Sequence, residues 1–231
     1  MQGEIDEHDN FGSAHAIAQQ RFVRLAKTPF STASLGIMNP TDYVAALRDD
    51  ALRKIGRNVV NFQKVEGCLK VLVAISNIQG TPADLEPRQL KNGVRLRRIP
   101  MGELAQSFHR NVYGDGPKSD APEDLSALWI SASLKLEADP KTVKARKQAL
   151  SKLVSERNKL IHQELASFDH NSAENCRRLI NVLDDQNTRI LDELEQMKSI
   201  FAMVKEFAGD LRTWVESDDF LNHVQGSNSD A

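Results

Sequence analysis

Residues 176–204, CRRLINVLDDQNTRILDELEQMKSIFAMV, carry the pattern that decides the fold of this chain. Apolar residues recur here at spacings of three, four and seven, as they do along the buried face of a long helix. They are Cys176, Leu179, Leu183, Ile190, Leu194, Met197, Phe201 and Val204. This near-heptad stripe predicts a seam in a helical bundle or a coiled coil, and not a cofactor-binding pocket.

A second stretch with the helical period covers residues 41–77. Asn39 or Thr41 can cap its first turn, because a side-chain oxygen at this position accepts a hydrogen bond from a free backbone N–H group. Its apolar residues recur at spacings of three and four, and they are Val44, Leu47, Ala51, Ile55, Val59, Phe62, Leu69 and Val73. Glu66 interrupts this stripe at a position where an apolar residue is expected.

A third long helix is predicted over residues 139–168. Asp139 and Pro140 combine a capping side chain with a proline at the first helical position. The residues expected to face inward are Leu150, Leu153, Val154 and Ile161. The loop FDHNS then interrupts the pattern, and Asn171 with Glu174 resembles a capping box at the start of the last helix.

The segments between the long helices have weaker patterns. Residues 79–100 contain prolines, glycines and basic residues, which is typical of a connector, and a short helix is expected over 101–111. Residues 128–136 alternate apolar and polar like a strand but have no obvious partner, so helix and strand both stay open. The whole pattern predicts an all-α fold, an antiparallel bundle of long helices with an inserted connector.

Length and composition narrow the choice of protein class. The 231 residues are 40% hydrophobic, enough for one sizeable core, and the net charge of −2 means that nucleic-acid binding would need a local basic patch. Cys68 and Cys176 form no C-x-x-C pair, which disfavours a disulfide scaffold and a cysteine zinc site. We see no signal sequence and no apolar run of about 20 residues. We therefore expect a cytoplasmic protein without a membrane partner.

One arginine stands out on the third helix. At 100° per residue, Arg157 lies in the middle of the apolar face, where a guanidinium needs a carboxylate, a water-filled cleft or a bound anion. Glu66 holds the matching place on the second helix and is a candidate partner. His162 lies five residues further on, rotated by roughly 140°, so the two side chains of one helix do not converge tightly. A two-fold dimer could supply a second copy of each.

Spacing alone says little about Arg157 and His162, since an arginine can be a structural ion pair and a histidine a surface residue. The sequence around them says more. RNKLIH at 157–162, inside LVSERNKLIHQEL, resembles the R-x4-6-H signature of the HEPN superfamily, and KIGRNVVNFQKVEGCLKVLVA resembles the first long helix of bacterial HEPN-like proteins. On this resemblance, residues 41–223 form a HEPN-like helical domain, after an N-terminal arm with a short helix (1–40) and before a disordered tail (224–231).

The resemblance implies a dimeric, metal-independent endoribonuclease with a composite site and no cofactor. Arg157 would bind the scissile phosphate, His162 would act as general acid or base on the ribose 2′-hydroxyl, and Asn158 would orient the phosphate or the histidine. Support of Arg157 by Glu66 is our inference and not part of the signature. The partners implied are RNA, a second copy of the chain, and an antitoxin or regulatory protein, as for a toxin or defence effector.

The chain differs from the best-known HEPN toxins at one position of the motif, and two alternative functions stay open. Glu164 stands where the motif of those toxins continues with a tyrosine, so inactivation by tyrosine modification is not expected. Many HEPN domains are non-catalytic modules that bind a protein partner or a nucleotide, and a plain helical scaffold is a third reading.

The most basic segment is a further candidate for RNA contact. Phosphate-binding side chains could come from Arg88, Lys91, Arg95, Arg97 and Arg98. A solvated, charged connector is the competing interpretation. We predict no metal site, because the histidines and acids lack metal-ligand spacing.

Overall fold

The computed structural model describes residues 39–116 and 129–218. The chain divides into two compact units, residues 1–43 and 44–231, and the description below concerns the second. The short helix expected within residues 1–40 and the tail 224–231 lie outside the described residues.

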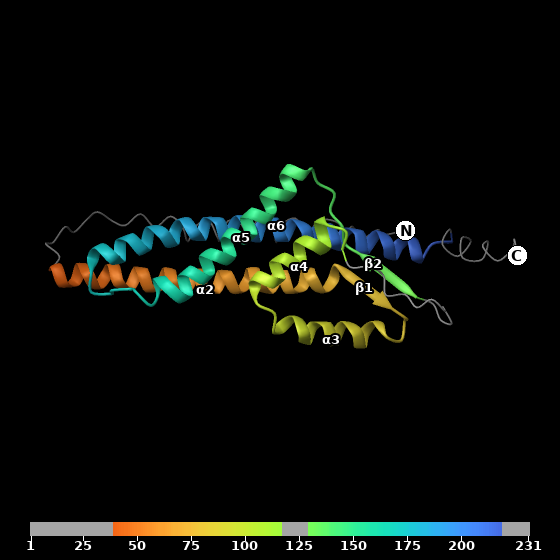
Figure 1. The fold of residues 1–231 in the computed structure, drawn as a ribbon, viewed down its shortest axis with the longest axis horizontal. Coiled ribbons are helices and arrows are strands. Elements are labelled where there is room, and N and C mark those ends of the chain that lie inside the picture. The colour runs from red at the N-terminus through yellow and green to blue at the C-terminus, as the bar shows by residue number, and fades with distance from the viewer. Residues whose placement is uncertain (1–38, 117–128, 219–231) are drawn as a thin grey trace, which may run out of the picture. The chain divides into compact units, whose positions relative to one another are not determined.

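The described part is mostly helical, as Figure 1 shows, and the all-α prediction is confirmed. The elements are α2 (Pro40–Ile75), β1 (Asn77–Gly80), α3 (Leu85–Arg97), α4 (Met101–Tyr113), β2 (Ile130–Ser133), α5 (Pro140–Lys159), the π-helical turn η1 (Leu160–Glu164) and α6 (Ala173–Val215).

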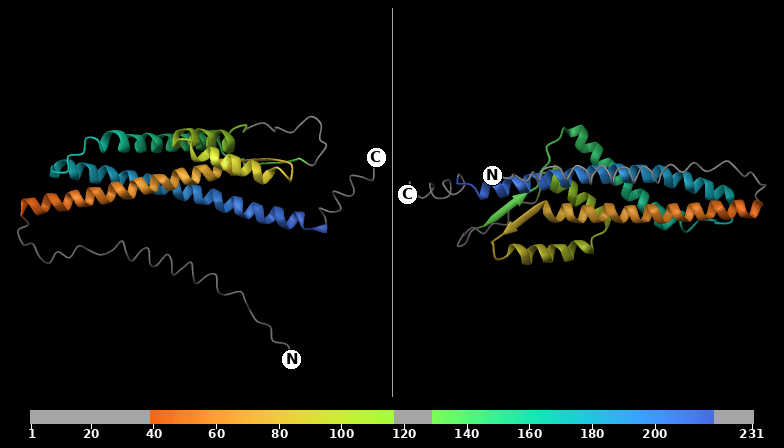
Figure 2. Two further views of the ribbon diagram at one scale, coloured as in Figure 1. Left: turned by 90° about the horizontal axis from the view of Figure 1, so that it is seen from below. Right: turned by 180° about the vertical axis from the view of Figure 1, so that it is seen from behind.

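Side-chain contacts give the directions of the long helices (Figures 1 and 2). Between α2 and α6 the residue numbers rise together, so the two helices run parallel; the pairs are Lys54–Asp184, Asn58–Gln186 and Asn61–Asn187. Between α5 and α6 they change in opposite senses, so these helices are antiparallel; the pairs are Arg146–Glu193, Glu156–Arg189 and Glu164–Arg178. The predicted antiparallel packing therefore holds for α5 and α6 but not for α2 and α6.

The predicted apolar stripes form most of the core. On α6, Leu183 and Ile190 have no exposed surface, and the stripe stays buried through Met197 before Phe201 and Val204 become partly exposed. Leu150 and Leu153 of α5 are buried, and Val154 packs against the core at its edge. The α4 helix adds a strongly apolar face of its own, comprising Met101, Leu104, Ala105, Phe108 and Val112.

Two of the three expected helix starts are confirmed. The Asp139 side chain accepts hydrogen bonds from the backbone N–H groups of Lys141 and Thr142, at 2.9 and 3.0 Å. Asn39 accepts one from the N–H of Thr41 at 3.3 Å. The third expectation is wrong by one residue, because Ser172 and not Asn171 caps α6.

The region read as a connector is more ordered than predicted. Residues 79–100 contain the end of β1 and the whole of α3, a helix of 13 residues. The open question over residues 128–136 is settled for a strand at Ile130–Ser133, which pairs antiparallel with Asn77–Gly80. The partner was not obvious in the sequence because it is a four-residue strand directly after a long helix.

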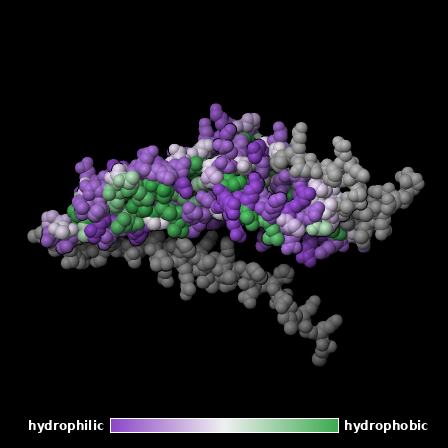
Figure 3. Space-filling view, turned by 60° about the horizontal axis from the view of Figure 1, so that its bottom comes forward, coloured by the Kyte–Doolittle hydropathy of each residue, from purple (hydrophilic) through white to green (hydrophobic). Residues whose placement is uncertain are grey.

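Some apolar side chains remain on the surface of the described helices. Figure 3 shows apolar patches between polar ones on one face of the molecule. Large exposed apolar residues include Val60 and Val71 of α2 and Phe207 and Leu211 near the end of α6. Within the described ranges, no helix is long and apolar enough to cross a membrane.

Candidate functional site

The segment that carries Arg157, Asn158 and His162 changes its helical geometry in the middle. The first two residues lie in the last turn of α5, and His162 lies in η1, where the backbone N–H of Leu165 donates to the carbonyl of Leu160 at 3.1 Å. A π turn advances by a smaller angle per residue than an α turn, so the angle between Arg157 and His162 is smaller than the roughly 140° of a regular helix. Such turns occur often at functional sites.

Arg157 is half-buried and holds no carboxylate among the residues that the structure describes. Its one recorded hydrogen bond goes from Nη1 to the Oδ1 atom of Asn158, at 3.0 Å. Because a guanidinium has five N–H donors, most of its donor capacity remains for another acceptor. The Asn158 side chain therefore orients Arg157 without neutralising it.

Glu66 does not make the contact with Arg157 that the sequence suggested. Its carboxylate binds Nζ of Lys70, one turn further along α2, at 2.7 Å. The Lys70 amine also donates to the backbone carbonyl of Arg97 at the end of α3, at 3.4 Å. Glu66 is thus occupied on its own helix, and its polar position in the α2 stripe is explained by this local pair.

The charges next to Arg157 are already paired. Glu156 binds Arg189 of α6 at 2.8 Å. Glu164, which ends η1, is buried and binds Arg178 at 2.9 Å and Lys159 at 3.3 Å. The hydrogen bond from Arg178, helped by Lys159, holds the pKa of the Glu164 carboxyl below its ordinary value despite burial. Glu164 is therefore a structural anion that fastens the π turn to α6.

His162 is exposed, in contrast to the buried Leu160 in the same turn. An imidazole in contact with water keeps access to protons, which a general acid or base requires. The structure thus gives one half-buried cation and one exposed imidazole on neighbouring turns. It brings Arg157 and Asn158 into contact and leaves His162 on the following turn.

The basic residues of α3 lie away from this segment. In Figures 1 and 2, α3 packs beside β1, apart from the junction of α5 and η1. Arg88 stacks over the ring of Trp129 at 5.2 Å, and Arg95 binds Asn92 at 3.0 Å. The five candidate residues for RNA contact are all exposed; they are Arg88, Lys91, Arg95, Arg97 and Arg98. Their exposure is compatible with contact to RNA phosphates and equally with a charged surface in contact with water.

A buried polar network near the site was missed in the sequence. Asn58 has no exposed surface, and its amide donates to the carbonyl of Leu183 at 2.8 Å and to Gln186 at 2.9 Å. Gln186 in turn donates to the backbone carbonyl of Glu156 at 3.4 Å. The network joins α2, α6 and α5 one residue before Arg157. The sequence did contain a sign of this network, because the polar Asn58 directly precedes the apolar Val59 of α2.

Comparisons with known proteins give no direct identification. No family model, no curated protein and no solved structure matches this chain. In the described part of the chain, no group of three or more histidine, cysteine or acidic side chains is arranged to hold a metal ion. The residues around Arg157 and His162 must therefore carry the functional argument.

Proposed function

We propose that this chain is a metal-independent endoribonuclease of HEPN type, which acts as a homodimer through Arg157 and His162. One observation carries the proposal. The Arg157 guanidinium is half-buried and unneutralised beside a π turn, whereas the charges at Glu156, Lys159 and Glu164 are paired. A partly desolvated cation without a counter-ion is suited to bind a phosphodiester.

A second subunit completes the site in this proposal. Arg157 and His162 of one chain lie on successive turns at different angles, so one chain alone offers a phosphate ligand without a converging pair of proton-transfer groups. A two-fold axis beside the motif supplies the second copy of each.

The chemistry follows from these groups. His162 of one subunit takes the proton of the ribose 2′-hydroxyl, whose oxygen attacks the phosphorus and forms the new P–O2′ bond. The P–O5′ bond breaks, and the protonated imidazole of the partner's His162 gives its proton to the leaving 5′-oxygen. Arg157 stabilises the charge that builds up on the phosphoryl oxygens. The products are a 2′,3′-cyclic phosphate and a 5′-hydroxyl end.

The decisive experiment is cleavage of a mixed pool of single-stranded and structured RNA by the full chain in EDTA. Wild type is compared with Arg157→Ala and His162→Ala at matched folding and dimer content. His170→Ala is the matched control, because His170 is an exposed histidine on the loop after η1.

Cleavage that persists in EDTA and in His170→Ala, but stops in both motif variants, supports the composite site. Intact RNA after incubation with folded wild-type dimer rejects the ribonuclease and favours the non-catalytic module that binds a protein or a nucleotide. Cleavage that continues in His162→Ala also rejects the assigned mechanism.

A further inference from the structure

Two neighbouring clefts beside the α4 helix are lined by cations. The larger, about 540 Å³, lies between α4 and α5 and includes His109, Arg110 and Lys147. The smaller, about 340 Å³, lies where α3 and β1 meet α4 and includes Arg88, Arg95 and Arg110. Arg110 lines both clefts, so the two are adjacent.

Neither cleft is lined by an aspartate or a glutamate. This separation of charge is unusual for the chain, which has 32 acidic and 30 basic residues in total. By comparison, the crevice between η1 and α6 contains Glu156 and Glu164 together with Lys159 and Arg189. Cations gathered without acids leave a positive potential that attracts an anion.

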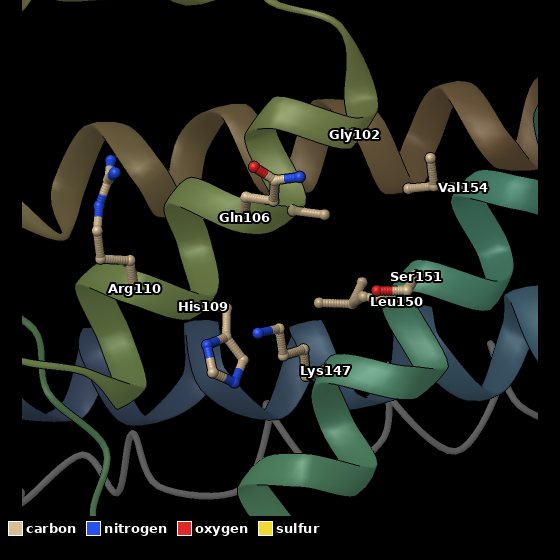
Figure 4. A pocket seen from close by; sticks show the side chains of 9 residues that line it. Gly102, Gln106, His109, Arg110, Lys147, Leu150, Ser151 and Val154 are labelled. Atoms are coloured by element: carbon tan, nitrogen blue, oxygen red, sulfur yellow. The ribbon is translucent and has the colours of Figure 1, made fainter.

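The larger cleft also offers hydrogen-bonding groups and apolar surface. Figure 4 shows the side chains of His109 and Lys147 approaching one another between α4 and α5, with Gln106 above them. The Nε2 atom of His109 is buried and has no hydrogen-bond partner in the described part of the chain. A buried polar atom without a partner is costly, so a rotation of the ring that brings this atom to a ligand in the cleft would be favoured. Leu150 and Val154 also line this cleft and give it apolar surface.

We propose that the two clefts form one track for the phosphodiester backbone of single-stranded RNA, with Arg110 at the joint. The smaller cleft holds phosphates against Arg88 and Arg95, and the larger holds the next nucleotides against Lys147. The ring of Trp129 lies against Arg88 at 5.2 Å, beside the smaller cleft that Arg88 lines, and an aromatic ring is suited to stack on a base. A linked series of phosphates fits two adjoining cationic clefts better than a single nucleotide does.

The choice of RNA as the ligand rests on the proposed function, but binding along the track is separate from cleavage at Arg157. The track uses residues of β1, α3, α4 and the middle of α5, and none of Arg157, Asn158 and His162 lines either cleft. It also gives a role to Arg88 and Arg95, while Lys91, Arg97 and Arg98 lie outside the track.

The test uses fluorescence anisotropy with the full chain and an RNA of about 12 nucleotides, fully 2′-O-methylated so that it cannot be cleaved through its 2′-oxygen. Variants Arg110→Glu and Lys147→Glu are compared with Lys152→Glu, an exposed lysine of α5 that lines neither cleft. Each track variant should raise Kd about tenfold or more and reduce the salt dependence, whereas Lys152→Glu should change Kd less than about twofold. Circular dichroism checks folding, and Ser151→Trp blocks the larger cleft without removing a charge.

Adenosine monophosphate and inorganic phosphate serve as the competing ligands. If either binds through Lys147 while the RNA does not, the cleft is a nucleotide or phosphate site and the track is wrong. Unchanged RNA affinity in both charge-reversal variants also overturns it. If the track variants weaken binding but no RNA is ever cleaved, the track stands and the proposed ribonuclease fails.

Discussion

Arg146 and Arg157 lie on the same helix and have opposite surroundings. Arg146 is held by both oxygens of Glu193, at 2.6 and 3.1 Å, and Glu193 is only 3% exposed. Arg157, three turns later, bonds to the neutral side chain of Asn158 and meets no carboxylate within residues 39–116 and 129–218. Two arginines of one helix therefore differ in role: the first is a structural ion and the second is available to a ligand.

The residues of α6 cause the difference. Because α5 and α6 are antiparallel, Glu193 comes opposite Arg146, while Gln186 and Arg189 come opposite the turn of Glu156 and supply no acid. Nothing in the sequence of α5 alone separates the two arginines. The comparison shows that the partner helix, not the local motif, decides which charge is free for function.

The largest difference that we expect between the two arginines is in the free energy of unfolding after each is replaced by alanine. Arg146→Ala should lower the free energy of unfolding by about 3–5 kcal/mol, because it leaves the buried Glu193 carboxylate without its partner. Arg157→Ala should lower it by less than about 1 kcal/mol, since no ion pair is lost. Urea unfolding of both variants measures this, and equal losses would show that Arg157 is also structural.

A double replacement sharpens the same point. Arg146→Met with Glu193→Leu should recover most of the stability lost in Arg146→Ala, about 2 kcal/mol or more, because a buried ion pair is often no better than apolar residues of similar size. Burial raises the pKa of Glu193 even though Arg146 opposes this, so desolvation outweighs the pairing. A double variant as unstable as the single one would mean that the pair contributes more than it costs.

Subunit mixing tests the composite site proposed at Arg157 and His162. The proposed mechanism uses His162 of both subunits, so a dimer that joins a wild-type chain to a His162→Ala chain should not cleave RNA. After equal amounts of the two chains are mixed and refolded, about a quarter of the dimers are wild type, so the cleavage rate should fall to about a quarter of the rate of the same amount of wild-type protein. A rate of about one half would contradict a composite site, because it would mean that each subunit cleaves independently.

The smallest expected effect concerns pH and the π turn. The pKa of Glu164 is lowered in the folded protein, so its stabilisation is present above the unfolded value of about 4.3 and is lost as the pH falls toward the folded pKa. Glu164→Gln should lower stability by about 1 kcal/mol at pH 7 and show less loss on acidification. Thermal unfolding at pH 7 and near pH 4 compares the two proteins.

The pKa of Glu193 is shifted in the opposite direction to that of Glu164, so Glu193 serves as the control. Its pKa is raised, so its ionisation weakens the fold as the pH rises from the unfolded value through the folded one. Glu193→Gln should remove that decline. If both variants respond to pH in the same direction, the roles assigned to the two carboxylates are wrong.

Local signals predicted the long helices well. The Asp139–Pro140 start and the apolar stripe of α6 depend on residues close in sequence, and both are present in the structure. The connector was misjudged because Pro87 and Gly93 were read as breakers. Pro87 lies in the first turn of α3, where its missing N–H matters little, and Gly93 lies on a side of the helix with no neighbour within 4 Å.

The candidate site was only partly predictable. The position of Arg157 on α5 and its contact with Asn158 follow from neighbouring residues, and the motif drew attention to them. The pairing of Glu66 with Lys70 could not be separated from a pairing with Arg157 until the packing of α2 was known. The cationic clefts were missed because their residues come from five elements, and no short stretch of sequence contains them.

The π turn at Leu160–Glu164 takes up one more residue per turn than an α-helix would. The number of residues between two side chains therefore does not give the angle between them here as it would in a regular α-helix. Deleting one residue within the turn and restoring α-geometry would leave the downstream residues facing nearly the same direction, because the π turn and the α turn that is one residue shorter cover about the same angle around the helix axis. A signature whose arginine and histidine are separated by a variable number of residues can then describe one constant geometry, with the local winding of the helix absorbing the difference.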